Sequence, residues 1–139
     1  MLDFDKIRQS PEEDYMNEEQ LAFFKQLLTD LSQKTIEQIK DAREDITQPA
    51  SDVDPIDIAT LEAERALKLK IVDRQTKLLV KIDESLNMIE QGTYGFCLET
   101  GEKIGIERLL LRPTATLSVD AKSIREESEK DYGPKDSNE

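Results

Sequence analysis

The sequence predicts a mainly α-helical fold: a long antiparallel coiled-coil helical hairpin, a small globular domain and a C-terminal helix. Two long segments repeat apolar residues every three or four positions, which is the spacing of one face of a helix. A short turn bounded by prolines joins these segments. After Gly92 the pattern changes to alternating large residues with glycines, which is typical of a tight hairpin.

The composition also favours extended helices over a compact globule. Charged residues make up 36% of the 139-residue chain and hydrophobic residues 37%, with no Trp, four Phe and three Tyr. So few large apolar side chains build only a thin core. We therefore expect each helix to bury one stripe and to expose the rest of its surface.

The first long helix is expected from about residue 18 to about residue 46. Asn17 and Gln20 form a variant of the capping box at its start. The expected apolar stripe consists of Leu21, Phe24, Leu28, Leu31, Ile36, Ile39 and Ala42.

The second long helix is expected to begin at Pro55, because Asp54 suits the N-cap and Asp57 suits the first turn. Gly92 is a natural stop after Gln91. Helices of roughly 30 and 36 residues, joined by so short a turn, must lie antiparallel, and each spans about 45–55 Å. The expected stripe consists of Leu67, Ile71, Leu78, Ile82, Leu86 and Ile89.

Four segments are expected along the chain. They are an N-terminal arm (1–16), the hairpin (17–91, with its tip at about 47–59), a globular domain that packs with the arm (92–130) and a flexible tail (131–139). Within the globular domain a helix is expected from Ser118 to about Lys130. Its apolar filling is expected from Phe96, Leu98, Ile104, Leu110 and Leu117.

The charge and the missing motifs exclude several functions. The net charge of −12, with 31 acidic and 19 basic residues, argues against direct DNA binding and against an anionic membrane surface. No export signal and no long apolar run is visible, so we expect a cytoplasmic protein without a membrane span. The absence of His, of a nucleophile elbow and of a glycine-rich phosphate loop indicates that the chain is not an enzyme.

Several short motifs resemble one bacterial family. They are Tyr15-Met16-Asn17, Asp54-Pro55-Ile56-Asp57-Ile58-Ala59, Tyr94-Gly95-Phe96-Cys97, Ile104-Gly105-Ile106 with Arg108-Leu109, and Arg112-Pro113-Thr114-Ala115. In order and spacing they resemble the DksA family of transcription regulators. The resemblance implies a monomer whose hairpin enters the secondary channel of RNA polymerase. It would modulate initiation in the stringent response, inhibiting ribosomal RNA promoters, with guanosine tetraphosphate as effector and no tightly bound cofactor.

The chain departs from this family at the zinc site. Typical members bind zinc through two C-x-x-C pairs, but here the four positions hold Cys97, Thr100, Ser118 and Ala121. One thiolate without any histidine cannot supply a tetrahedral zinc site. The resemblance is therefore to a zinc-independent branch, with a degenerate zinc-finger-like hairpin and no bound metal.

The tip acids have two compatible interpretations. Asp54 and Asp57 suit the start of a helix, where capping and the helix dipole favour carboxylates. Carboxylates at the end of a long hairpin can also reach a metal-loaded or cationic site inside a partner, and the small Ala59 leaves room for close approach. With the resemblance, Asp54, Asp57 and Ala59 are the expected polymerase-active residues.

A cationic row is the second candidate site. Arg74, Lys77 and Lys81 share one face of the second helix. Such a row can be ion-paired to acids of the first helix, or it can hold a phosphorylated ligand. By resemblance, Arg74, Leu78, Lys81 and Lys122 match residues that contact guanosine tetraphosphate at the interface with polymerase.

Other interpretations remain open. Cys97 can be a redox sensor or a buried remnant, and the second is favoured because Lys103 is the only cation near it in sequence. The protein can instead be a coiled-coil adaptor that does not bind polymerase. A third possibility is a transcript-cleavage helper whose tip carboxylates hold Mg²⁺.

Overall fold

The computed structural model describes residues 2–47, 55–118, 122, 124 and 126–128. In chain order its elements are α1 (Phe4–Arg8), the 3₁₀ turn η1 (Glu12–Asp14), α2 (Glu18–Thr47), α3 (Pro55–Gln91) and α4 (Ile106–Leu111). The chain forms two compact units. Residues 25–87 make the hairpin unit, and residues 1–24 with 88–139 make the globular unit. No helix in the described ranges is both long enough and apolar enough to span a membrane.

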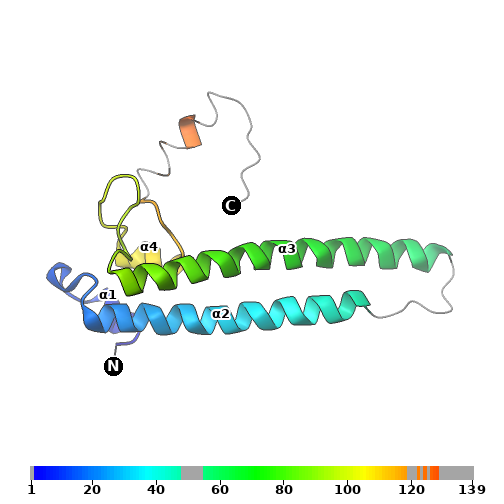
Figure 1. The fold of residues 1–139 in the computed structure, drawn as a ribbon, viewed down its shortest axis with the longest axis horizontal. Helices are drawn as coiled ribbons and strands as arrows, with labels where there is room; N and C mark the ends of the chain where they lie inside the picture. The colour runs from blue at the N-terminus through cyan, green and yellow to red at the C-terminus, as the bar shows by residue number, and fades with distance from the viewer. Residues whose placement is uncertain (1, 48–54, 119–121, 123, 125, 129–139) are drawn as a thin grey trace. The chain divides into compact units, whose positions relative to one another are not determined.

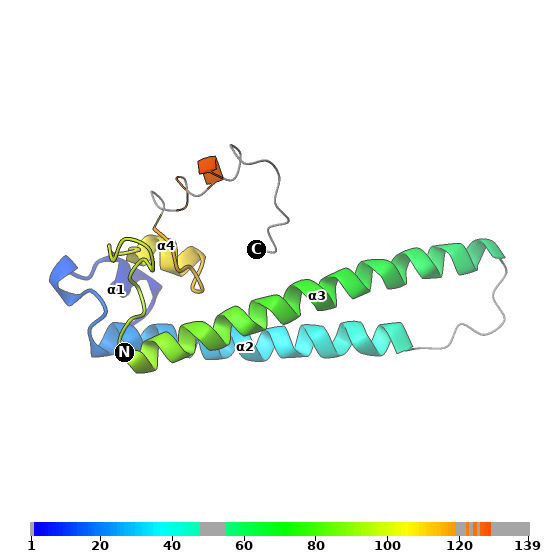
Figure 2. The same cartoon turned by 45° about the horizontal axis from the view of Figure 1, so that its top comes forward.

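The hairpin unit is a coiled coil of two antiparallel helices, as expected from the sequence. In this unit α2 and α3 run side by side, and Figures 1 and 2 agree on this. The buried side chains along α2 include Leu28, Thr35 and Ala42, which are seven residues apart, as in a heptad repeat. Polar contacts across the pair join Gln75 to Gln38. An ion pair also joins Lys68 Nζ to Asp45 Oδ2 at 2.8 Å.

Two residues of the expected apolar stripes were assigned wrongly. Ile36 is 50% exposed, whereas its neighbour Thr35 is buried and donates its hydroxyl hydrogen to the carbonyl of Leu31 at 2.7 Å. The heptad that starts at Leu28 keeps position 35 on the contact face and turns position 36 away from it. Leu67 is 62% exposed because the seam-side position belongs to Lys68, which ion-pairs with α2.

The ends of the long helices follow local sequence signals. The Asn17 side chain accepts a hydrogen bond from the backbone N–H of Gln20 at 2.9 Å, and the Gln20 side chain accepts one from the N–H of Met16 at 2.9 Å. This exchange is the expected capping box with one difference. The Gln20 side chain bonds to the N–H of Met16, one residue before the N-cap Asn17, instead of to the N–H of Asn17 itself. Helix α3 begins at Pro55 and ends before Gly92, whose φ is 77°.

The globular unit is built around a few aromatic and aliphatic side chains. Phe24 and Tyr94 are buried, with ring centroids 5.5 Å apart. Ile7 of α1 and Leu109 of α4 are fully buried, and α1 packs against α4. The arm is therefore part of the globular core. Residues 122, 124 and 126–128 are helical, as expected for the C-terminal helix, whereas Ser118, the expected first residue of that helix, is not helical.

The expected β-hairpin after Gly92 is much shorter than the sequence suggested. The described residues contain no strand, and only one antiparallel bridge joins Phe96 to Lys103. Gly95 and Gly101 have φ values of 91° and 76°, so the chain turns before a ladder can form. Leu98, expected in the core, is 62% exposed on this short loop.

Candidate functional site

The expected tip site lies at the start of α3. The first turns of α3 extend past the end of α2 in both views (Figures 1 and 2). Asp57 is in the first turn, and Asp57 and Ala59 are both exposed. Asp54 lies outside the described residues. The hairpin unit thus presents a carboxylate and a small side chain on a helical segment that is not flanked by α2.

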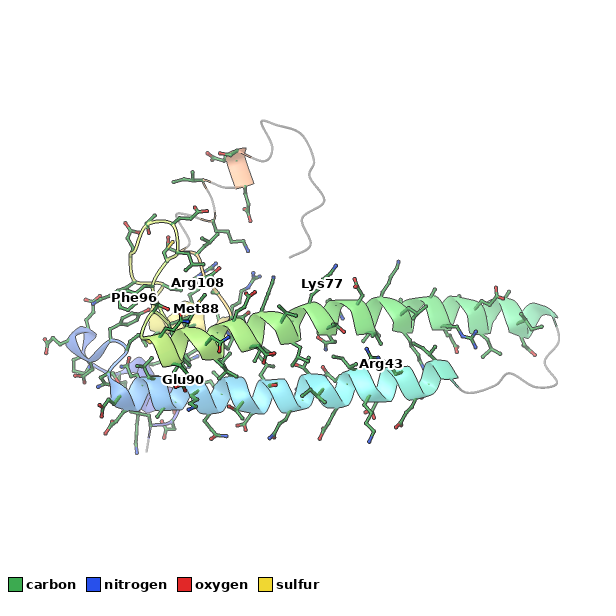
Figure 3. All side chains as sticks on the ribbon, viewed as in Figure 1. Arg43, Lys77, Met88, Glu90, Phe96 and Arg108 are labelled. Atoms are coloured by element: carbon green, nitrogen blue, oxygen red, sulfur yellow. The ribbon has the colours of Figure 1, made fainter. Side chains whose placement is uncertain are left out.

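The cationic row lies further along the same helix. Arg74 is exposed, while Lys77 and Lys81 are half-buried. Figure 3 shows the Lys77 side chain pointing away from α2. Lys77 forms an ion pair with Asp73 on the same helix, Nζ to Oδ2 at 3.1 Å. This geometry differs from one interpretation of the sequence, in which the row pairs with acids of the first helix.

The remaining expected nucleotide contacts divide between the two units. Leu78 is half-buried on α3, on the same face as Arg74 and Lys81. Lys122 belongs to the globular unit, where it is half-buried and its backbone N–H donates to the Ser118 carbonyl at 3.0 Å. Helix geometry therefore brings the three α3 residues together.

Two of the degenerate zinc positions, Thr100 and Ser118, lie next to the sulfur of a third, Cys97, and the fourth, Ala121, is outside the described residues. Cys97 is 3% exposed. Burial raises the pKa of its thiol, but hydrogen bonds to the sulfur from the Thr100 hydroxyl and from the backbone N–H groups of Ser118, Thr100 and Glu99 outweigh burial. Together they lower the pKa from 9.0 to about 6. Thus Thr100 and Ser118 each donate a hydrogen bond to the Cys97 sulfur.

These residues do not fit a structural zinc ion. Zinc requires four thiolate, imidazole or carboxylate ligands, and of the four positions only Cys97 offers one. Thr100 and Ser118 carry hydroxyl groups and Ala121 a methyl group, and none of these is a ligand of structural zinc. The described part of the chain contains no group of three or more His, Cys, Asp or Glu residues placed so that it could hold a metal ion.

Two features of these sites were missed from the sequence. The cationic row begins one turn earlier, at the exposed Lys70, four residues before Arg74. The i, i+4 spacing would have identified it. The groups that lower the Cys97 pKa are mostly backbone N–H groups, whereas the sequence argument depended on Lys103, the one cation near it in sequence. No side-chain pattern reveals them.

Comparisons with known proteins agree with this architecture. A family model for the DnaK suppressor protein DksA, N-terminal domain, matches residues 20–89. A second model, the prokaryotic dksA/traR C4-type zinc finger, matches residues 92–127. The chain is 42% identical over 127 residues to the RNA polymerase-binding transcription factor DksA of Caulobacter vibrioides, covering 88% of this chain and 87% of that protein.

A second relative and a solved structure show the same similarity. The protein of the same name from Escherichia coli K12 is 38% identical over 130 residues, covering 88% of this chain and 82% of that protein. The solved structure of transcription factor DksA2 from Pseudomonas aeruginosa matches with a TM-score of 0.81 and 41% identity. The match covers 91% of this chain and 98% of that one. By sequence and by fold, the chain belongs to the DksA family.

Proposed function

We propose that this protein is a non-enzymatic transcription regulator that binds RNA polymerase. The main support is its similarity, over most of both chains, to relatives named RNA polymerase-binding transcription factors. The hairpin adds a physical argument. A coiled coil with an exposed carboxylate on a projecting helical turn suits insertion into a narrow opening of a large partner.

The tip is proposed to act inside the secondary channel of polymerase. Asp57, with Asp54 three residues before it in the sequence, would deliver negative charge, and Ala59 would allow close approach. A carboxylate that is solvated in the free protein becomes a strong local charge when a partner excludes water around it, because screening weakens there. The tip therefore changes initiation, including inhibition of ribosomal RNA promoters, without catalysing a reaction itself.

Guanosine tetraphosphate is proposed as the effector. Arg74 and Lys81 lie about two turns apart on one face, with Leu78 between them, and Lys122 contributes from the globular unit. Cationic side chains on one face suit a ligand with several phosphate groups, because charge-assisted hydrogen bonds to phosphate are strong. The nucleotide would bind where this face meets polymerase.

The globular unit is proposed to fold without zinc. Hydrogen bonds to the buried Cys97 sulfur and the aromatic core around Tyr94 take over the cross-linking that four zinc ligands provide elsewhere in the family. We also propose that the active form is a cytoplasmic monomer that regulates promoters through polymerase rather than by binding DNA, in keeping with its net charge of −12.

Transcription in vitro tests the proposal. Purified polymerase and a ribosomal RNA promoter are combined with the protein, with and without guanosine tetraphosphate, and polymerase binding is measured in parallel by pull-down. We expect binding, inhibition, and stronger inhibition with the nucleotide. Failure to bind polymerase would favour a coiled-coil adaptor. Cleavage of RNA in stalled complexes would favour a Mg²⁺-dependent transcript-cleavage helper.

A further inference from the structure

One peptide group of the globular unit is held from both sides. It joins Leu117 to Ser118, and we call it the anchor peptide. Its carbonyl, on Leu117, accepts a hydrogen bond from Arg108 Nε at 3.0 Å. Its N–H, on Ser118, donates a hydrogen bond to the sulfur of Cys97. Because a peptide group is planar, it cannot rotate without breaking one of these two bonds, so its orientation is fixed.

The groups on the two sides match the polarity of the anchor peptide. The carbonyl end of a peptide dipole is negative and its N–H end is positive. The half-buried Arg108, whose guanidinium is always charged, lies at the carbonyl end, and the electron-rich sulfur of Cys97 lies at the N–H end. Hydrogen bonds from a charged donor are strong, and bonds in a chain polarise one another. Arg108 and Cys97 should therefore strengthen each other's hold on this peptide.

The anchor peptide also determines how the next helical segment begins. The Ser118 carbonyl accepts a hydrogen bond from the N–H of Lys122 at 3.0 Å, with the four-residue spacing of an α-helix. Ser118 itself is not helical, so it has the role of an N-cap, whose carbonyl takes the first helical bond. The direction in which the helical segment leaves Ser118 thus follows from the orientation of the anchor peptide.

We propose that Arg108 is a positioning residue, which sets the direction of the Lys122 side chain by holding the anchor peptide. The inference rests on the proposed function in one respect, namely that Lys122 contacts guanosine tetraphosphate. Arg108 would not touch the nucleotide and would act only through the chain from Leu117 to Lys122. A fixed direction matters for Lys122, because a charge-assisted hydrogen bond to phosphate depends on distance and angle.

The segment before the anchor peptide has tethers of its own. The Pro113 carbonyl accepts a hydrogen bond from the Tyr94 hydroxyl at 2.7 Å, and the Thr116 carbonyl accepts one from the N–H of Leu98 at 2.9 Å. Loss of the Arg108 bond should therefore loosen the start of the helical segment while the globular unit stays folded.

Hydrogen exchange of the full chain without polymerase tests the inference separately from the proposed function. In Arg108→Met the Lys122 amide should exchange about tenfold faster than in the parent, because a bond from a charged donor is lost. The amide of the buried Ile104, which bonds to the Gly95 carbonyl at 2.9 Å, reports on the fold and should not change. Unchanged exchange at Lys122, or equal acceleration at Ile104 and Lys122, would overturn the inference.

A matched control variant is available in the same unit. Arg8 also uses its Nε for a contact with α4, to Glu107 Oε1 at 3.4 Å, but this contact does not involve the anchor peptide. Arg8→Met should leave exchange at Lys122 as in the parent. Acceleration at Lys122 equal to that in Arg108→Met would show that any loss of an arginine from this unit loosens the segment, and would contradict the proposed role of Arg108.

The other end of the anchor peptide provides a second variant. Cys97→Ala removes the sulfur that accepts the Ser118 N–H, so it should also accelerate exchange at Lys122. Since both substitutions act through one peptide group, the acceleration in the double variant should fall below the product of the two single effects. A double variant that reaches the full product would show that Arg108 and Cys97 act independently, and would contradict the inference.

Transcription in vitro links Arg108 to the nucleotide. Arg108→Met should raise the concentration of guanosine tetraphosphate that gives half of the maximal effect by about tenfold, while inhibition without the nucleotide stays near that of the parent. Arg108→Lys, which keeps a charged donor, should recover most of the response, whereas a purely structural role would lower inhibition with and without the nucleotide alike. An unchanged half-maximal concentration in Arg108→Met would overturn the inference. If the parent itself does not respond, the proposed effector is wrong, and the exchange data alone decide whether Arg108 holds Lys122.

Discussion

Tyr15 and Gly95 are eighty residues apart in sequence, and the Tyr15 hydroxyl donates a hydrogen bond to the Gly95 carbonyl at 2.5 Å. The same hydroxyl accepts a hydrogen bond from the N–H of Gly105 at 3.0 Å. Burial raises the pKa of Tyr15, while the N–H groups of Gly105 and Ile104 oppose that rise. One phenol on the arm therefore holds two turns of the globular unit together.

Tyr15→Phe should destabilise the globular unit. The substitution keeps the ring, its edge-to-face contact with Phe96 and the Lys103 cation over it, but it removes both hydrogen bonds. Part-buried partners left without a hydrogen bond should lower the free energy of unfolding by about 1–3 kcal/mol, measured by urea denaturation. The control Thr76→Ala removes an exposed hydroxyl that bonds within α3 and should change stability by less than about 0.5 kcal/mol. Equal effects would show that the phenol does not join the turns.

The contribution of Cys97 to stability should depend on pH. Its folded-state pKa is about 6, below the 9.0 of an ordinary thiol, so folding favours the thiolate. That stabilisation is complete above pH 9 and is lost as the pH falls from about 9 towards 6. Denaturation of the parent and of Cys97→Ala at pH 6, 7.5 and 9 measures it. The stability difference between the two proteins should widen as the pH rises, and a constant difference would show that the thiol stays protonated.

Zinc should bind only after the missing ligands are restored. The parent should contain no stoichiometric zinc by elemental analysis, and a chelator should leave its thermal midpoint unchanged. A variant with Thr100→Cys, Ser118→Cys and Ala121→Cys should bind one zinc, because Thr100 and Ser118 already contact the Cys97 sulfur. One zinc per chain in the parent would contradict the proposed metal independence.

The response to guanosine tetraphosphate should depend on the cationic row. Lys81→Ala removes a half-buried surface charge and should change stability by about 0.5 kcal/mol or less. Loss of one charge-assisted phosphate contact should weaken the nucleotide response by about 1.5–3 kcal/mol. Lys122→Ala should act in the same direction. Lys40→Ala, which removes an exposed cation on α2, is the control. A parental nucleotide response in both test variants would exclude this site.

Local signals in the sequence were enough for the two long helices and their ends. The cap at Asn17, the start at Pro55 and the stop at Gly92 each depend on one or two neighbouring residues, so they could be read directly. The exposure of Ile36 and Leu67 could not be read in this way. It depends on which residues of the opposite helix meet them, which a single periodic stripe does not determine.

The region around Cys97 could also be predicted only in part from the sequence. The resemblance to the DksA family pointed to the four degenerate zinc positions, and the ligand chemistry of threonine, serine and alanine then predicted that no zinc binds there. The sequence could not identify the backbone N–H groups around the Cys97 sulfur, since every residue but proline carries one. It also gave no sign that Leu98 would be exposed, because that depends on a turn at Gly101.

The most direct test of the proposed role of the tip is to measure how strongly the Asp57→Asn variant inhibits a ribosomal RNA promoter, together with its affinity for polymerase. Asparagine keeps the shape of the side chain and much of its value at a helix start, so the variant should lose at most about 1 kcal/mol of stability. Polymerase affinity should stay near that of the parent while inhibition of a ribosomal RNA promoter is largely lost. Asp83→Asn, at an exposed position further along α3, is the matched control and should inhibit normally. Full inhibition by Asp57→Asn would contradict the proposal and leave Asp57 as a helix-start residue alone.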